Sequence, residues 1–160
     1  MKKLLILDFD FTLCDSSTRE NKHTNNDVLD LTAYHADTAQ HDKACPLLQW
    51  ILRNRTAVTN KYNVLILTNR DFFALCHSPI KTLVQNRFIC YHRGIYAPLY
   101  GDNFKAILLA KLCQQNNRVL FVDDEQKYLQ IARDNRARAI CARDLWHYKQ
   151  HEFTALFFGT

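Results

Sequence analysis

Four aspartates lie at the ends of two strongly apolar segments of this 160-residue sequence. Asp8 and Asp10 follow the first segment, Leu4–Leu7, and Asp123 and Asp124 follow the second, Val119–Val122. Continuous apolar runs are typical of strands buried on both faces of a parallel sheet. Ligands of open parallel sheets bind beyond the carboxyl ends of the strands, so the four side chains converge if the two strands are neighbours. Negative charge at that density needs a neutralising cation. Mg²⁺, a hard divalent ion with oxygen ligands, is the usual one, and we expect it here.

Groups that suit a phosphoryl group fall at the same predicted edge. Thr68, followed by Asn69, ends a third apolar run and offers a hydroxyl, while Lys105 stands at the start of a predicted helix and offers an ammonium. An ammonium is a favourable partner for phosphate oxygens. Carboxylates that attack phosphorus and form aspartyl-phosphates are a recognised chemical solution. The pattern therefore indicates a carboxylate nucleophile, a second acid two residues on, a metal and a phosphate-binding group.

Short apolar runs alternate with longer segments of helical period, which predicts an α/β fold with a parallel sheet. The predicted strands are Lys3–Asp8, Tyr62–Thr68, Phe88–His92, Val119–Asp123 and Arg138–Cys141. The predicted helices are Pro46–Arg55, Asp71–Asn86 with a break near Pro79, Asn103–Gln115 and Glu125–Asn135.

The polar segment 14–44 does not fit this alternation, because Asn, His, Asp and Thr occur throughout it. A segment of that length is uncommon as a simple loop in a compact domain and usually signals a functional insert. Since it follows the first strand, we expect it to overhang the carboxyl edge of the sheet as a small cap or flap. We assign residues 1–150 to one domain and 151–160 to a C-terminal tail. The apolar stretch Phe153–Phe158 of that tail either packs on the domain or docks a partner or a further segment.

The motifs that carry these residues resemble, in order, those of the haloacid dehalogenase-like (HAD) superfamily, over about Lys3 to Lys149. The quoted stretches are Leu-Ile-Leu-Asp8-Phe-Asp10-Phe-Thr12-Leu, Leu-Ile-Leu-Thr68-Asn-Arg, Gly101-Asp-Asn-Phe-Lys105 and Val-Leu-Phe-Val-Asp123-Asp124. The chain departs from the commonest pattern at Phe11, where many members carry Gly. The resemblance implies a three-layer Rossmann-like sandwich with a central, mainly parallel sheet, in which residues 1–150 are the catalytic domain.

The resemblance also implies roles for the two acids of the first motif. Asp8 would be the nucleophile and a Mg²⁺ ligand. Asp10 would be the general acid and base, and its backbone carbonyl would bind the metal. Environments that push the pKa values of two carboxyls apart are the pattern expected for such divided roles.

The remaining motif residues would hold the phosphate and the metal. Thr68 would hold a phosphate oxygen, and Lys105 would bind the phosphate and neutralise Asp8. Asn69, with Arg70 beside it, is a candidate substrate contact, the alternative being a plain loop role. Asp123 would complete the metal shell, with Asp124 either assisting it or orienting Lys105.

The implied activity is that of a Mg²⁺-dependent phosphomonoester hydrolase. The insert 14–44 is too short for a full cap domain, and family members with small caps leave the site open and act on large substrates. A phosphoprotein is therefore the favoured substrate, with phosphotyrosine as one candidate. The alternatives are a polynucleotide 3′-phosphatase, a small-molecule phosphatase or nucleotidase, and a HAD-like binding module without catalysis.

Composition narrows the function classes further. The chain has 21 Lys and Arg against 16 Asp and Glu, a net charge of +5, without the concentrated basic stripe of a dedicated nucleic-acid binder. No stretch approaches the roughly 18 apolar residues of a membrane span. The apolar start of the chain is shorter than the roughly 7–15 residues of a signal-peptide core, so we expect a cytoplasmic protein. The six cysteines form no CxxC pair and suit packed thiols in a reducing compartment.

Overall fold

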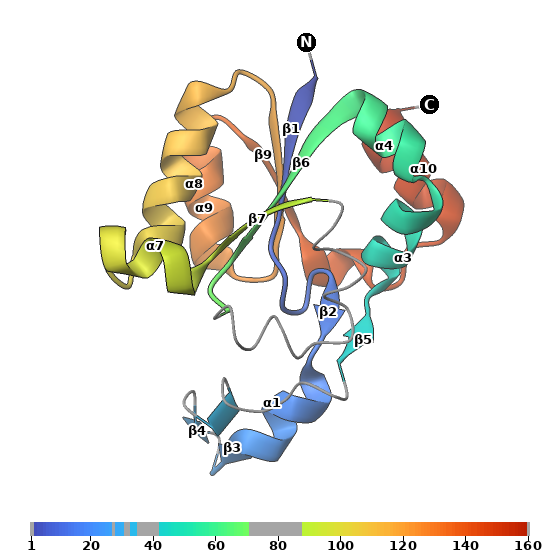
Figure 1. Cartoon of the computed structure of the whole chain (residues 1–160). Coiled ribbons are helices and arrows are strands. Elements are labelled where there is room, and N and C mark those ends of the chain that lie inside the picture. Colours follow the sequence, from blue (N-terminus) through green and yellow to red (C-terminus); the bar gives the residue numbers. More distant parts are fainter. Residues whose placement is uncertain (1, 27, 31–32, 35–41, 71–87, 160) are drawn as a thin grey trace.

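The computed structural model describes residues 2–26, 28–30, 33–34, 42–70 and 88–159. A five-stranded parallel sheet forms its centre, in the order β7-β6-β1-β8-β9 (Figure 1). The strands are β1 (Lys3–Leu7), β6 (Tyr62–Thr68), β7 (Ile89–His92), β8 (Val119–Asp123) and β9 (Arg138–Cys141). The sheet confirms the predicted α/β, Rossmann-like architecture.

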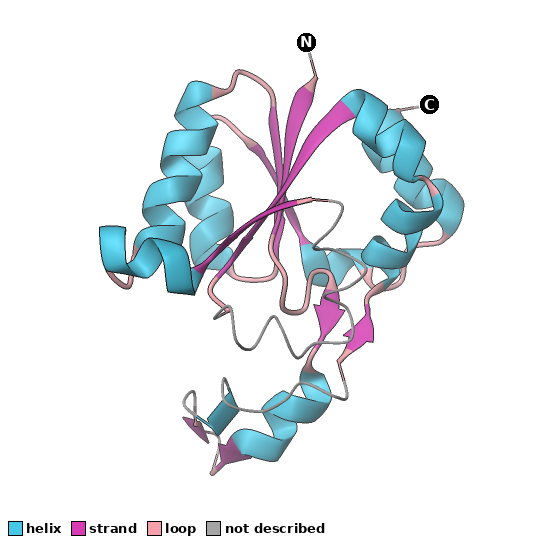
Figure 2. Ribbon diagram, in the orientation of Figure 1, coloured by secondary structure: helices cyan, strands magenta, loops and turns pink. Residues whose placement is uncertain are grey.

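Helices cover both faces of this sheet (Figure 2). One layer holds α3 (Pro46–Arg53), α4 (Arg55–Lys61) and α10 (Gln150–Phe158), with the 3₁₀ turn η1 (Ala142–Leu145) following β9. The other layer holds α7 (Arg93–Tyr100), α8 (Phe104–Gln115) and α9 (Gln126–Asp134). Successive side chains of a strand point to opposite faces, so Leu5 and Leu7 enter the first layer's core and Ile6 enters the second.

The central position of β1 decides which polar residues meet at the carboxyl edge of the sheet. β1 pairs in parallel with β6 on one side and with β8 on the other, with Leu7 opposite both Ile66 and Val122. The residues that follow these three strands therefore emerge side by side at the carboxyl edge.

The insert lies beyond this edge (Figure 1). Its two ends are joined by the antiparallel pair β2 (Cys14–Asp15) and β5 (Lys43–Ala44). Between them lie α1 (Ser17–His23) and the short pair β3 (Thr24–Asn25) and β4 (Val28–Leu29).

The C-terminal segment packs on the domain through aromatic side chains. Phe153 and Phe157 of α10 are buried, and their rings stack on Trp50 of α3 at centroid distances of 5.7 and 5.0 Å. The Tyr62 hydroxyl donates a 2.6 Å hydrogen bond to the Phe157 carbonyl. α10 thus packs in the same helix layer as α3, and its C-terminal end lies beside the start of β6.

Most predicted strand bounds are confirmed, but the helices differ in two places. The helix predicted over Pro46–Arg55 ends at Arg53, because Asn54 leaves helical geometry (φ −106°, ψ 23°), and α4 follows it. The sequence prediction missed α4 and α7. α4 buries only Val58, and α7 buries no residue fully but packs on the core through the partly buried Tyr96, Ala97 and Tyr100. The helix predicted over Asp71–Asn86 lies outside the described residues.

The described cysteines are free thiols, either buried or half-buried. Burial raises the pKa of Cys45 to about 12 and that of Cys113 to about 11, which keeps both thiols protonated and unreactive. Over the described ranges, no helix combines the length and apolar character needed to cross a bilayer.

Removing the Phe157 ring should destabilise the fold strongly. Phe157→Ala takes away the ring that contacts Trp50 and Tyr62, and large-to-small changes of this kind cost about 3–5 kcal/mol. Urea unfolding followed by circular dichroism measures the loss. His151→Ala, at an exposed position of the same helix, should change the free energy of unfolding by less than about 0.5 kcal/mol. Equal effects of the two changes would show that α10 is not part of the core.

Candidate active site

Three carboxylates meet where β1 and β8 end. The Asp8 peptide N–H donates to the Val122 carbonyl at 2.9 Å and extends the pairing of the two strands, which brings Asp8 beside Asp123. Carboxylate oxygens of Asp8, Asp123 and Asp124 all lie within 4.8 Å of one another. Asp8 and Asp123 are buried, with 4% and 0% of their surface exposed. The structure thus brings together three of the four acids that the sequence predicted to converge.

Lys105 lies buried between two of these acids. Its Nζ is 2.6 Å from Asp8 Oδ1 and 2.8 Å from Asp123 Oδ2, and only 1% of the residue is exposed. The ammonium also lies 4.3 Å from the ring centroid of Tyr128. The first turn of α8 projects this side chain toward the strand ends, since α8 begins one residue earlier at Phe104.

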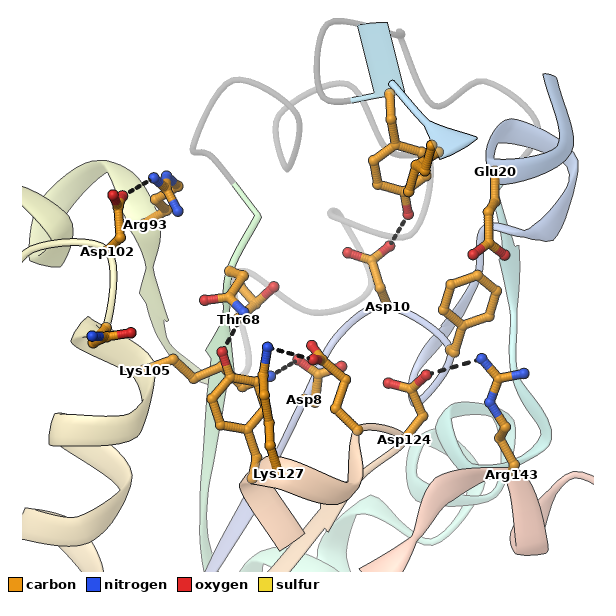
Figure 3. Close-up of a pocket in the computed structure, with 17 residues that line it drawn as sticks. Asp8, Asp10, Glu20, Thr68, Arg93, Asp102, Lys105, Asp124, Lys127 and Arg143 are labelled. Atoms are coloured by element: carbon orange, nitrogen blue, oxygen red, sulfur yellow. Dashed lines mark hydrogen bonds and ion pairs between the residues drawn. The ribbon is translucent and has the colours of Figure 1, made fainter. Parts of the chain in front are cut away.

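Asp123, and not Asp124, holds Lys105 in place. Asp124 instead forms an ion pair with Arg143 of η1 at 3.2 Å (Figure 3). We expected Asp124 either to assist the metal or to orient Lys105. The second role is wrong, because Asp123 contacts Lys105 and Asp124 contacts Arg143. Asp124 remains a candidate metal ligand beside Asp8 and Asp123.

The cluster carries more negative than positive charge. Burial raises the pKa of Asp8 well above its ordinary value, against the opposing effect of the Lys105 charge, and it likewise raises the pKa of Asp123. Burial and the charge of Asp123 raise the pKa of Asp124. Burial opposes the charge of Lys105, but Asp8 and Asp123 outweigh it and raise the pKa of the ammonium. Lys105 and the more exposed Arg143 together balance two of the three clustered carboxylates, which leaves a deficit of positive charge that a hard divalent ion with oxygen ligands fits.

A pocket of about 490 Å³ opens over this cluster. Asp8, Asp10, Thr68, Asn69, Lys105 and Asp124 line it, whereas Asp123 is fully buried and is not among the lining residues. A volume of this size is ordinary for a ligand site.

Thr68 ends β6 and lies on the same side of Asp8 as Lys105 (Figure 3). Asn69 follows it in the chain and also lines the pocket. The Thr68 hydroxyl oxygen accepts the peptide N–H of Arg70 at 3.0 Å, so its own proton stays available for a ligand oxygen. Asn69 Nδ2 donates to the Tyr128 hydroxyl at 2.9 Å. Both side chains are therefore oriented for polar contacts inside the pocket.

Tyr128 is a pocket residue that the sequence prediction missed. Tyr128 lies on α9 and is buried, but its hydroxyl reaches Asn69 at the pocket wall. The signal available in the sequence was a tyrosine at an inward position that an aliphatic residue could fill, because a buried hydroxyl needs a polar partner.

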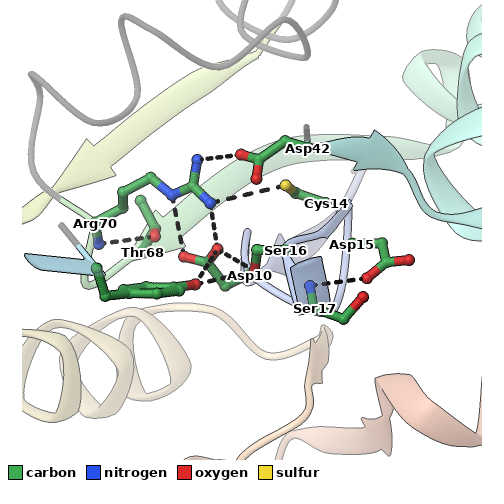
Figure 4. Close-up of polar contacts among 9 residues, drawn as sticks. Asp10, Cys14, Asp15, Ser16, Ser17, Asp42, Thr68 and Arg70 are labelled. Carbon is green, nitrogen blue, oxygen red and sulfur yellow. Dashed lines mark hydrogen bonds and ion pairs between the residues drawn. The ribbon is translucent and has the colours of Figure 1, made fainter. Parts of the chain in front are cut away.

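Asp10 is held by a buried arginine from the end of β6 (Figure 4). Arg70 Nε donates to Asp10 Oδ2 at 3.1 Å, and Nη2 contacts Oδ1. Nη1 donates to Asp42 Oδ2 at 2.8 Å. Arg70 is fully buried, with its guanidinium 4.7 Å from the ring centroid of Phe9. Burial opposes its charge, but Asp10 outweighs that effect and raises the pKa of Arg70.

The prediction that Arg70 contacts substrate is therefore not supported, since its side chain lies behind Asp10 and does not line the pocket. The reason is the pair of acids that surrounds the guanidinium, Asp10 of the first motif and Asp42 near the end of the insert. Asp10 receives two further bonds, from Ser16 Oγ at 2.9 Å and from the Tyr34 hydroxyl at 3.1 Å. The insert is thus bonded directly to the second acid of the first motif.

No family model matches the sequence, and no curated protein matches it significantly. Solved structures do resemble it. A haloacid dehalogenase-like hydrolase from Streptococcus pneumoniae superposes with a TM-score of 0.64 at 15% identity, over 98% of each chain. The HAD domain of the effector protein Lem4 from Legionella pneumophila gives 0.56 at 12% identity, over 98% of this chain and 94% of the other. A HAD-superfamily hydrolase from Ehrlichia chaffeensis gives 0.52 at 14% identity, over 88% of each chain. At these identities the likeness shows the fold: the chain has a HAD-like fold.

Replacing Arg70 should destabilise the protein far more than replacing an exposed arginine. Arg70→Leu removes the guanidinium that neutralises buried Asp42, and breaking a buried ion pair costs about 3–5 kcal/mol. The matched control, Arg93→Leu, breaks the exposed pair with Asp102 and should cost less than about 1 kcal/mol. Urea unfolding measures both. Adding Asp42→Asn to Arg70→Leu should recover part of the loss; if it deepens the loss, the charge argument is wrong.

Stability without metal should fall as the pH rises. The pKa values of Asp8, Asp123 and Asp124 are raised in the folded protein, which therefore keeps its protons to higher pH than the unfolded chain, whose carboxyls titrate near about 4. Mg²⁺ should offset the resulting loss, so it should raise the melting temperature more at pH 7.5 than at pH 5. At about 100 times its dissociation constant it would add about 2.7 kcal/mol. Thermal scans with EDTA or Mg²⁺ at both pH values test this, and Asp124→Asn should reduce the shift.

Proposed function

We propose that this protein is a Mg²⁺-dependent phosphomonoester hydrolase that acts through an aspartyl-phosphate on Asp8, with a phosphoprotein as its substrate. The observation that carries the proposal is the buried contact of Lys105 with Asp8, at the floor of a pocket that Thr68, Asn69 and Asp124 also line. One pocket would then hold the nucleophilic carboxylate, the phosphate-binding donors and an excess of acids. Its position beyond the carboxyl ends of the strands is where ligands bind in open α/β sheets.

The metal would be held by Asp8 and Asp123, with Asp124 and the backbone carbonyl of Asp10 as further candidate ligands. When bound, Mg²⁺ supplies positive charge to the phosphoryl oxygens and acts as a Lewis acid. Lys105 adds a fixed cation from the other side of Asp8, and Thr68 adds a hydroxyl donor. Donors fixed in advance toward developing charge are the main source of rate enhancement in such sites.

The reaction divides into two displacements at phosphorus. Lys105 contacts Oδ1 of Asp8, so we assign the attack to Oδ2. The new Oδ2–P bond forms as the ester O–P bond breaks, and the leaving oxygen takes a proton from Asp10. A water molecule then gives a proton to Asp10 and attacks phosphorus, which releases inorganic phosphate and restores Asp8. The guanidinium of Arg70 contacts both carboxylate oxygens of Asp10 and so fixes the orientation of this side chain.

The charges around the pocket support a protein substrate over a nucleic-acid end. The pocket's rim cations Arg93, Lys127 and Arg143 each pair with a carboxylate, namely Asp102, Glu125 and Asp124. Carboxylates also outnumber cations among the lining residues. Nucleic-acid binding depends on unpaired cations that neutralise phosphates, so this rim suits a polynucleotide 3′-end poorly.

Changing the two acids should separate their roles. Asp8→Asn should abolish turnover while phosphate binding persists, because the amide is not a nucleophile. Asp10→Asn should slow turnover by about 10²–10⁴-fold, the usual contribution of a positioned acid and base. Rates with an aryl phosphate and Mg²⁺, on variants with unchanged circular dichroism, give the measurement. A wild-type rate in either variant would contradict the assignment.

A substrate panel should place a phosphopeptide first. We expect a phosphotyrosine peptide to have a higher kcat/KM than a 3′-phosphorylated oligonucleotide or small phosphorylated metabolites. If the small esters are turned over fastest, the protein is a small-molecule phosphatase or nucleotidase. If folded protein with Mg²⁺ turns over none of them, the alternative of a binding module without catalysis is favoured.

A further inference from the structure

Phe11 occupies a backbone conformation that its side chain disfavours. Its φ of 55° lies in the left-handed region, where a Cβ atom meets the following carbonyl and where glycine would be unstrained. The ring is half-buried and lines the pocket. A bulky aromatic residue at such a position is a reason to look for a function of its ring.

The surroundings fix this ring in the pocket wall. The Phe11 N–H donates to the Cys14 carbonyl at 2.7 Å, and the Phe11 carbonyl accepts the indole N–H of Trp146 at 2.9 Å. The rings of Phe11 and Trp146 stack at 6.3 Å with an interplanar angle of 25°. The guanidinium of Arg143 lies 5.1 Å from the centroid of the Phe11 ring and also binds Asp124. Trp146 does not line the pocket, so it supports Phe11 from outside while Arg143 and Phe11 face the ligand space.

We expect the leaving group of the phosphate ester to lie beside Phe11 and Arg143. Thr68 and Lys105 lie on one side of Asp8, whereas Asp124 and Arg143 lie on the other (Figure 3). In an in-line displacement the leaving ester oxygen lies opposite the attacking oxygen of Asp8, where Asp10 would exchange its proton. Phe11 directly follows Asp10 in the chain and lines the same pocket. We therefore expect the first atoms beyond the ester oxygen to lie beside Phe11 and the adjacent guanidinium of Arg143.

We propose that Phe11 and Arg143 form a subsite for an aromatic ring bonded directly to the ester oxygen, so that the pocket prefers aryl phosphomonoesters such as phosphotyrosine. This inference rests on the proposed function and names the residues that set its substrate class. The Phe11 ring supplies an aromatic contact, and the planar guanidinium supplies a stacking surface. Leu29 and Tyr34 of the insert line the same pocket and add apolar surface. A nucleobase suits the subsite less well, because a sugar separates it from the ester oxygen.

Phe11→Leu and Arg143→Met test the subsite. Phosphotyrosine and phosphoserine peptides of one sequence should differ in kcat/KM in favour of phosphotyrosine. Phe11→Leu should lower kcat/KM for phosphotyrosine by about 2- to 12-fold, the range of one aromatic pair, with less than a twofold change for phosphoserine. Arg143→Met should act in the same direction and keeps the test valid if Phe11→Leu does not fold. Asp144→Asn, an exposed neighbour of Arg143 outside the pocket, is the matched control and should change neither value.

Equal losses for both peptides, or no loss, would overturn the subsite. The subsite would also be overturned if Phe11→Leu lowered kcat/KM for a nucleoside monophosphate as much as it lowers kcat/KM for phosphotyrosine. Binding of phenylphosphonate against methylphosphonate, measured by calorimetry, gives a readout that does not need turnover. Ring-dependent binding without hydrolysis would support the subsite while the proposed function fails. Hydrolysis without any ring preference would overturn the subsite and leave the proposed function standing.

Discussion

The buried contact of Lys105 with Asp8 and Asp123 is the interaction on which the site depends. An ammonium without water is stable only when carboxylates surround it, and here each of two parallel strands supplies one. That arrangement requires β1 and β8 to be neighbours in register and α8 to begin within reach of both, which is what the parallel order of the sheet provides. The same contact leaves the cluster short of positive charge, because one lysine faces two carboxylates and Arg143 balances only Asp124. The ion pair that stabilises the floor of the pocket thus also creates the demand for a divalent cation.

Asp8 and Asp10 are two residues apart, yet a different cation governs each. Asp8 shares a lysine with Asp123, whereas Asp10 shares an arginine with Asp42. The planar guanidinium binds Asp10 through both carboxylate oxygens and fixes its orientation, which a lysine could not do. Asp8 keeps one oxygen on the ammonium and lies in the pocket beside the acid cluster. Different partners for neighbouring acids are the physical basis for dividing nucleophilic and proton-transfer roles between them.

The sequence predicted those features that depend on local pattern. The strands Tyr62–Thr68 and Val119–Asp123 were predicted to the residue because buried parallel strands form continuous apolar runs. The bounds of Arg138–Cys141 were also predicted correctly, although this edge strand has no buried residue. The meeting of Asp8 with Asp123 followed from the rule that strand ends share an edge. The burial of Arg70 could not be predicted, since it depends on Asp42 and Asp10, which lie 28 and 60 residues away in the chain. The contact of Lys105 with Asp123 instead of Asp124 likewise required coordinates, because both acids fit the motif equally.

The Arg70 cluster also determines how the insert acts. Asp42 comes from the end of the insert, and Tyr34 and Ser16 from within it, so three of its residues bind the Asp10 and Arg70 side chains. Swinging the insert away as a lid would separate Asp42 from Arg70 and leave buried charges without their partners, at a cost typical of broken internal ion pairs. The described residues Ser16, Tyr34 and Asp42 of the insert are therefore tied to the wall of the pocket through Asp10 and Arg70. Under the proposed function, a phosphate at the end of a long side chain would reach the pocket without breaking these contacts.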